Sequence, residues 1–359
     1  MFVACAGRVG IWLFPLNPGL RRVPPTRLFN LEYMKLINKK NMTVLTVLGG
    51  VMMPSMSWAC ACGCGVFDVG GSTMLPTGPG GMVYVQYDWQ NQDHNWSGTS
   101  QAPSANNGDK DIKTDFMMVG AQYMFNQSWG AQIEIPDDYR IFTTLGGANG
   151  TTPTTLKWNA LGDIRVHAIY TGFAEDLSSG LDFGLKLPTG DFTHNDQYGD
   201  IDRDSEIGTG STDVLLGGFH RGNIAQSQSW EYFVQGELDL PVLTQDEYRP
   251  GWEFDSDAGI DYSFSIGRVH ISPLAQVIVS YRGSDSGSAA SGGLDDSDPP
   301  DVLGKPDSGY GRVLLSPGIE IHIHPIVIYG DVEVPVWQDF TGNQLAAAVL
   351  FKLNVSYHF

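Results

Sequence analysis

Residues 345–359 read LAAAVLFKLNVSYHF, and their side chains alternate between two kinds. The odd positions are apolar, with aromatic residues toward the end: Leu345, Ala347, Val349, Phe351, Leu353, Val355, Tyr357 and Phe359. The even positions become polar toward the end, with Lys352, Asn354, Ser356 and His358. Because successive side chains of a β-strand point to opposite faces, this pattern predicts a strand with one face toward lipid and one toward water.

A final strand of this kind, ending on an aromatic residue, resembles the C-terminal signal of bacterial outer-membrane β-barrels. An ordinary half-buried strand of a secreted β-sandwich is the alternative. The rest of the chain favours the barrel, because eleven more segments alternate in a similar way: 83–89, 117–125, 129–135, 164–170, 181–187, 213–220, 230–240, 258–266, 271–281, 313–323 and 328–336. We therefore expect an all-β protein, a transmembrane antiparallel up-and-down β-barrel of about twelve strands, in a range of about 10–14.

The links between these segments alternate in length. Short links lie at 126–127, 174–178, 222–227, 267–268 and near Pro325, and long links lie at 91–111, 136–159, 189–211, 244–254, 283–308 and 338–343. Short turns on one rim and long loops on the other are typical of outer-membrane barrels. An even number of strands then puts both termini on the short-turn side, which we expect to be periplasmic.

The segment 34–59 has the three parts of a secretory signal peptide. Lys35, Lys39 and Lys40 precede an apolar stretch at 42–53, and Ser57-Trp58-Ala59 forms a small-x-small cleavage site. We expect Met34 to be the start, with 1–33 as a mis-start or disordered extension, 60–80 as a Cys-rich periplasmic segment and 81–359 as the barrel. No run of about 18 apolar residues occurs in the body of the chain, so helical membrane spans are not expected.

The chain is acidic, with 21 Lys and Arg against 40 Asp and Glu. Residues 1–59 hold seven of the basic residues and one of the acidic ones, so the mature part keeps 14 and 39, a net charge of −25. Such a surface argues against nucleic acid as a partner, because phosphates bind to basic surfaces. It suits a wetted surface that favours cations and repels anions.

Cysteines are concentrated at the expected mature N-terminus, at Cys60, Cys62 and Cys64. Thiolates two residues apart can bind one soft ion such as Cu(I) or Zn(II). A lipid anchor on Cys60, a disulfide, or no special role are the alternatives. The position of signal-peptide cleavage also has two alternatives, since Ala59-Cys60-Ala61 is a second small-x-small site, and cleavage there would remove Cys60.

Five histidines lie near short turns or the C-terminus: His220, His270, His322, His324 and His358. Alternation turns the last four inward, with Glu320 two residues before His322. We expect them at the periplasmic mouth with the cysteines, where His322 and His324 could complete a metal site with Cys60, Cys62 and Cys64. Imidazoles at the interface without any ligand are the alternative.

Two acidic stretches in the long links, 200–206 and 295–298, offer the oxygen ligands that Ca²⁺ prefers. EF-hand spacing is absent, so weak Ca²⁺ binding on the outer face and plain solvated loops both stay open. His270-Ile271-Ser272 is a His-x-Ser pair. Alternation turns it inward rather than toward lipid, and we expect no enzyme.

Alternation also places charged side chains inside the barrel. The lumen-facing residues that we expect to serve transport are Glu134, Arg165, Lys186, Glu231, Glu237, Asp261, Arg282, Arg312, Asp331, Glu333 and Lys352. With Asp163, Asp182 and Asp257 added, carboxylates outnumber basic groups, which favours cations over anions. Apolar residues are expected there too, at Phe116, Met118, Phe233, Leu274, Ile278 and Leu350, and they favour a narrow route over a wide pore.

Three segments in the middle of the chain resemble a known family. Gly162-Asp163-Ile164-Arg165 opens a strand, Lys186-Leu187-Pro188-Thr189-Gly190-Asp191 closes the next, and Gly208-Thr209-Gly210-Ser211-Thr212-Asp213 follows. In this order they resemble the outer-membrane proteins of the "MetA-pathway of phenol degradation" transporter-like family, over about 81–359. The resemblance implies a small barrel that passes small solutes, such as aromatic compounds.

These patterns together predict an outer-membrane channel or transporter for small solutes, narrow and cation-favouring. Its expected partners are outer-membrane lipid, a small-molecule or ionic solute, and the barrel-assembly machinery. The alternative is a barrel that handles soft metal ions, or docks a periplasmic metal or redox partner, through its Cys-rich segment.

Overall fold

Antiparallel β-strands form most of the structure described by the computed structural model. It describes residues 75–76, 78–146, 152–195, 201–291 and 308–359, all within the unit Met56–Phe359. The strands are β1 (Gly80–Gly98), β2 (Ser100–Gln101), β3 (Asp109–Met124), β4 (Trp129–Gly146), β5 (Thr152–Leu161), β6 (Arg165–Tyr170), β7 (Ser179–Lys186), β8 (Ser211–Asn223), β9 (Trp230–Thr244), β10 (Glu253–Tyr262), β11 (Phe264–Ile266), β12 (Val269–Arg282), β13 (Tyr310–Ile323) and β14 (Ile326–His358). In the described ranges, no helix is long and apolar enough to cross a membrane.

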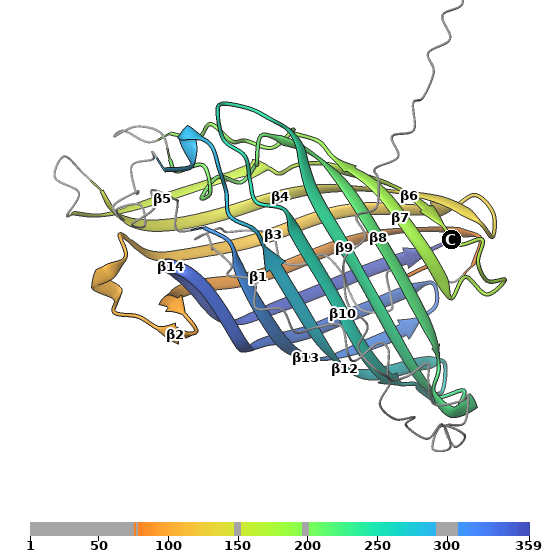
Figure 1. The fold of residues 1–359 in the computed structure, drawn as a ribbon. Coiled ribbons are helices and arrows are strands. Elements are labelled where there is room, and N and C mark those ends of the chain that lie inside the picture. Colours follow the sequence, from red (N-terminus) through yellow and green to blue (C-terminus); the bar gives the residue numbers. More distant parts are fainter. Residues whose placement is uncertain (1–74, 77, 147–151, 196–200, 292–307) are drawn as a thin grey trace, which may run out of the picture. The chain divides into compact units, whose positions relative to one another are not determined.

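Eleven of these strands close into a ring (Figure 1). Hydrogen-bonded neighbours follow the order β10-β9-β8-β7-β6-β4-β3-β1-β14-β13-β12, and β12 pairs with β10 to close the barrel. The remaining three, β2, β5 and β11, pair with β1, β4 and β12 respectively. The fold is therefore a closed antiparallel β-barrel, as predicted.

The chain runs along the barrel twelve times, because β14 doubles back on itself. Its first part, up to Phe340, pairs with β13, and its second part, up to His358, pairs with β1. The N–H of His358 donates to the carbonyl of Pro325 over 2.9 Å, so the two ends of β14 lie side by side. Gly342 adopts a φ of 61° between the two parts, a conformation that suits a turn.

Apolar side chains cover the outside of the wall and polar ones fill much of the inside. In the last strand Val355 is 42% exposed, whereas its neighbour Ser356 is 2% exposed. This arrangement is the reverse of a water-soluble β-sandwich, in which exposed faces are polar. It means that a low-polarity solvent surrounds the barrel.

Most of the exposed aromatic residues form two bands around the outside. One band lies at the short turns and contains Tyr123, Phe125, Trp129, Phe173, Trp230, Tyr262, Phe264, Tyr357 and Phe359; the other contains Tyr139, Trp252, Phe254 and Trp337. Phe254 and Phe264 lie ten residues apart along β10 and β11. A tilted strand of that length spans about 25 Å, which is the height of the apolar band of an outer-membrane barrel.

Three of the predicted long links are wrong, and one of them, 338–343, lies wholly inside β14. β4 continues to Gly146 and pairs with β5 from Thr152, so most of 136–159 is a strand pair. Likewise β1 extends to Gly98 and β3 begins at Asp109, which shortens the link predicted at 91–111. Threonine-rich and polar stretches look like loops in the sequence, but here they pair as strands beyond the apolar band, where the outward face no longer needs to be apolar.

Candidate functional site in the barrel lumen

The structure places the eleven charged residues predicted for the lumen on inward positions. Seven are buried: Glu134, Lys186, Asp261, Arg282, Asp331, Glu333 and Lys352. Four are partly buried: Arg165, Glu231, Glu237 and Arg312. Because they come from many different strands, barrel closure is what brings them together, and their role in transport remains a prediction.

One group of these side chains gathers around His167 of β6. Its Nδ1 lies 2.7 Å from Oδ1 of Asp182 and 3.8 Å from Oε2 of Glu237, and its Nε2 lies 3.7 Å from Oε2 of Glu134. Arg165 lies 3.9 Å from Glu237. We call Glu134, His167, Asp182 and Glu237 the His167 cluster.

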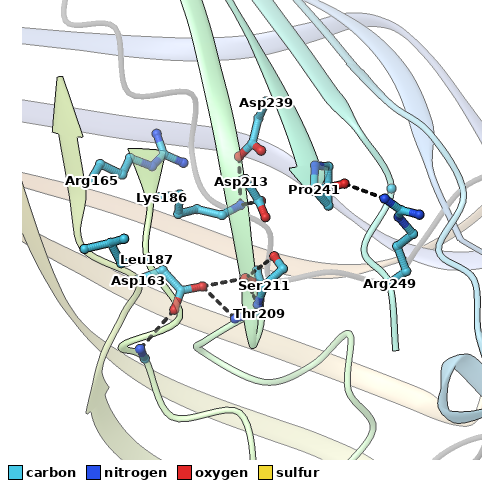
Figure 2. Close-up of polar contacts among 12 residues, drawn as sticks. Asp163, Arg165, Lys186, Leu187, Thr209, Ser211, Asp213, Asp239, Pro241 and Arg249 are labelled. Carbon is cyan, nitrogen blue, oxygen red and sulfur yellow. Dashed lines mark hydrogen bonds and ion pairs between the residues drawn. The ribbon is translucent and has the colours of Figure 1, made fainter. Parts of the chain in front are cut away.

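A second group surrounds Lys186, whose ammonium lies against two carboxylates (Figure 2). It donates to Oδ2 of Asp239 over 2.7 Å and forms an ion pair with Asp213. Both carboxylates are on inward positions of neighbouring strands, β8 and β9. This group lines the lumen with one basic and two acidic side chains.

A third group lies on the first half of β14. Oδ2 of Asp331 accepts hydrogen bonds from Gln276, Ser316 and Tyr329 over 2.9, 2.6 and 2.7 Å. Glu333 lies 3.7 Å from the ammonium of Lys352. The predicted pair Asp331 and Glu333 therefore shares one stretch of the inner wall.

Asp163 fastens the link between β7 and β8 to the wall (Figure 2). Its Oδ1 accepts the N–H of Gly190 over 2.9 Å, and its Oδ2 accepts the N–H and hydroxyl of Thr209 over 2.8 and 2.5 Å. Gly190 and Gly208 touch through their backbones, since a Cβ added to Gly208 would lie 2.5 Å from the carbonyl carbon of Gly190. The three motifs quoted for the family resemblance thus build one structure, which we call the Asp163 clasp.

Residues 201–209, which we call the inward loop, fold into the long-loop end of the barrel. Nη1 of Arg140, itself 1% exposed, donates to the carbonyls of Ser205 and Glu206 over 2.6 and 3.1 Å. Ile201 packs among the buried side chains of Ile112, Phe142, Trp158 and Leu345, which come from β3, β4, β5 and β14. The loop is therefore held in the lumen by both polar and apolar contacts.

The buried inward loop differs from the acidic outer loop expected at 200–206. Ser205 and Glu206 are buried because the clasp and Arg140 draw the segment inward. Burial, together with the carboxylate of Asp191, raises the pKa of Glu206 to about 8. Asp200 and the second acidic stretch, 295–298, lie outside the described residues, and Ca²⁺ binding remains a prediction.

A cavity of about 150 Å³ borders the inward loop. Its charged lining includes Glu134, Arg165, Lys186, Asp239 and Arg282, and its apolar lining includes Phe116, Met118, Pro136, Ile207 and Pro250. The His167 cluster and the group around Lys186 therefore both border this cavity, and so does the inward loop. This is the part of the lumen where a solute would contact both charged and apolar side chains.

A larger cavity of about 520 Å³ lies at the short-turn end. Its lining includes Glu231, Asp261, His270, Glu320, His322, His324 and His358. His270 and His322 face each other across β12 and β13, and Nε2 of His322 lies 3.1 Å from Oε2 of Glu320. The four inward histidines therefore share one mouth, but Cys60, Cys62 and Cys64 lie outside the described residues, so the mixed metal site stays a prediction.

Sequence reasoning missed the inward loop and the partners of His167. Arg140 falls in 136–159, a stretch with the sequence pattern of a loop. Alternation along a strand therefore does not predict that its side chain points inward. The glycines at 184 and 217 carried a usable signal, because glycine inside a strand often marks a close approach of other groups. Finding those groups requires the register of four strands, which the sequence does not supply.

Of the comparisons with known proteins, the one with solved structures identifies the fold. No family model and no curated protein matches the chain. The structure is similar to the crystal structure of an outer membrane channel from Pseudomonas putida F1, with a TM-score of 0.56 and 11% identity over 82% of this chain and 100% of that one. This likeness shows that the chain has the fold of an outer-membrane β-barrel.

Two further solved structures are more distant. The β domain of the Bordetella autotransporter Brka has a TM-score of 0.46 and 14% identity, over 78% of this chain and 100% of that one. The CymD monoaromatic hydrocarbon channel has a TM-score of 0.39 and 8% identity, over 81% and 93%. The family suggested by the sequence motifs remains a prediction.

Proposed function

We propose that this protein is a narrow outer-membrane channel that passes small solutes and favours cations. One observation carries the proposal: a closed barrel, apolar outside, whose lumen holds an inward loop beside a cavity lined by charged groups. Because barrel closure leaves no open sheet edge, the lumen is the only route along the strands. The inward loop lies in that route and narrows it at the long-loop end.

The cavity beside the inward loop limits the size of the solute. A cavity of about 150 Å³ accommodates one ring-sized molecule such as benzene, and the value here is about 150 Å³. Phe116, Met118 and Ile207 offer apolar contacts, while Lys186 and Glu134 offer polar ones. We infer that the solute is a small molecule with an apolar body and a polar or charged group.

Liposome swelling tests the size limit. Refolded protein in liposomes should admit small cationic amines and ring-sized polar molecules, and should exclude disaccharides, because the inward loop limits the bore. Deleting residues 201–209 and joining the ends with two glycines should raise the size limit. If disaccharides cause equal swelling with the wild type and with the deletion variant, the loop does not set the size limit.

The expected orientation has the short-turn end and both termini in the periplasm. The backbones of Gly81 and Phe359 exchange hydrogen bonds of 2.9 and 2.8 Å, so the C-terminus and the start of β1 lie together. Protease added to intact cells should cut within 283–308, on the opposite rim. Cleavage confined to the short turns, such as 171–178, would reverse this orientation.

A second candidate function is the handling of soft metal ions at the short-turn mouth. The observation in its favour is the shared cavity of His270, His322, His324 and His358 with Glu320. Cys62 and Cys64, with Cys60 where cleavage spares it, would supply thiolates there. Copper content after reconstitution should fall in a Cys62→Ser, Cys64→Ser variant, and equal content would refute this role.

A further inference from the structure

The His167 cluster has the geometry of a metal site inside the barrel wall. One nitrogen of His167 and one oxygen each of Asp182 and Glu237 all lie within 4.8 Å of one another. A tetrahedral ion with bonds of about 2.1 Å sets its ligand atoms about 3.4 Å apart. The distances from Nδ1, 2.7 Å to Asp182 and 3.8 Å to Glu237, lie on either side of that value.

Three strands supply the ligands, and two glycines make room for them. His167 lies opposite Gly184, and a Cβ there would come within 2.7 Å of Nδ1. Gly217 of β8 lies opposite both Asp182 and Glu237. A Cβ on Gly217 would lie 3.1 Å from Cβ of Asp182 and 3.6 Å from Oε2 of Glu237. The carboxylates therefore converge across β8 because that strand carries no side chain between them.

The second nitrogen of His167 already faces a carboxylate. Nε2 is buried without a hydrogen-bond partner and lies 3.7 Å from Oε2 of Glu134. Glu134 is held by the hydroxyl of Tyr84 over 2.9 Å. A histidine that binds a metal commonly donates its other N–H to a carboxylate, which fixes the ring and makes it a better ligand.

Charge favours a divalent cation at this place. The cluster holds three carboxylates, and Arg165 is the basic residue next to them. With a neutral imidazole, three ionised carboxylates and Arg165 leave a charge of −2, which one divalent ion neutralises. The side chains of Asp182 and Glu237 are 19% and 22% exposed, so an ion can reach them from the lumen.

We propose that Asp182, Glu237 and Nδ1 of His167 bind one divalent first-row transition ion, with Glu134 orienting the imidazole. Two carboxylates and one imidazole suit Zn²⁺ and its neighbours. Protons compete with the ion for the imidazole nitrogen and the carboxylates, so binding weakens as the pH falls. This inference refines the proposed cation preference. Because it concerns metal binding, it can be confirmed or refuted whether or not the barrel conducts ions.

Metal content of the full-length protein tests the site directly. The protein is folded in detergent, its cysteines are alkylated so that thiols cannot compete, and it is loaded with Zn²⁺ and desalted. Asp182→Asn and Glu237→Gln should each hold one equivalent of Zn²⁺ fewer than the wild type. Glu134→Gln should keep the site but weaken it by about 10- to 100-fold.

Asp213→Asn is the matched control, because Asp213 is also a buried lumen carboxylate paired with a basic side chain, that of Lys186, and belongs to neither proposed metal site. It should keep the equivalent that the cluster variants lose. Heat-modifiable gel mobility shows whether each variant is folded, and Co²⁺ absorption of the wild type gives a second readout that needs no variant. A wild type that retains no Zn²⁺ or Co²⁺, or equal contents in the wild type and folded Asp182→Asn, would overturn the proposal. Either result leaves conductance to decide the proposed function separately.

Discussion

At the scale of single residues, the lumen is organised by buried carboxylates that accept several hydrogen bonds each. Asp163 accepts from Gly190 and twice from Thr209, and Asp331 accepts from three different side chains. Such bonds to a charged acceptor are worth more than neutral ones. Those of Asp163 hold irregular backbone in place, whereas those of Asp331 join side chains of neighbouring strands.

Replacing Asp163 tests the clasp. Asp163→Asn removes the charge and turns one acceptor into a donor that faces the N–H groups of the clasp. We expect the free energy of unfolding to fall by about 2–3 kcal/mol, and the inward loop to become sensitive to added protease. Asp176→Asn is the control, since Asp176 accepts a 3.1 Å bond from the N–H of Ser178 in an exposed short turn away from the clasp. Equal effects of both changes would show that the clasp is not specific.

Glu206 gives the inward loop a pH dependence. Its pKa of about 8 lies above the ordinary value of 4.5, so the folded protein holds this proton more tightly than the unfolded chain. The folded state therefore loses stability as the pH rises from about 4.5 to 8, with no further loss above that. Conductance should change between pH 7 and 9 as the loop loosens. The conductance of Glu206→Gln should not change between pH 7 and 9. If this variant keeps the pH dependence of the wild type, another group causes the effect.

At the scale of elements, alternation of side chains predicts the strands well where both faces have a strong preference. The second half of β14 is the best case, because lipid requires an apolar outward face and the lumen tolerates Lys352 and Asn354. The same reasoning fails for β4 and β5 beyond the apolar band, where Thr143 pairs with Thr155 and the outward face is polar. The inward loop could not be predicted, since its place depends on partners from distant strands.

The first half of β14 offers a test of ion selectivity on one element. Asp331→Asn with Glu333→Gln removes two negative charges from the inner wall while keeping side-chain size. The cation preference in a salt gradient should decrease, because fewer carboxylates face the permeating ion. Glu175→Gln, an exposed carboxylate in a short turn, should leave the reversal potential unchanged. An unchanged reversal potential in the double variant would exclude this wall as the selective region.

At the scale of the whole molecule, the barrel combines twelve runs of chain with charged groups that are distant in sequence. The sequence predicts the closed barrel and the inward direction of its charged residues, because both follow from alternation. It does not predict which of those residues meet: the His167 cluster needs β4, β6, β7 and β9 in register, and the cavity needs the inward loop in place. The proposed route depends on these long-range contacts.

Conductance across a planar bilayer tests the central claim most directly. Protein shown to be folded by heat-modifiable mobility is added to one side, and currents are recorded in a tenfold gradient of potassium chloride. We predict discrete steps of small conductance and a reversal potential with the sign of a cation-favouring channel, weaker in Asp331→Asn, Glu333→Gln. Folded, inserted protein that gives no steps, or a reversal potential of the opposite sign, would contradict the account.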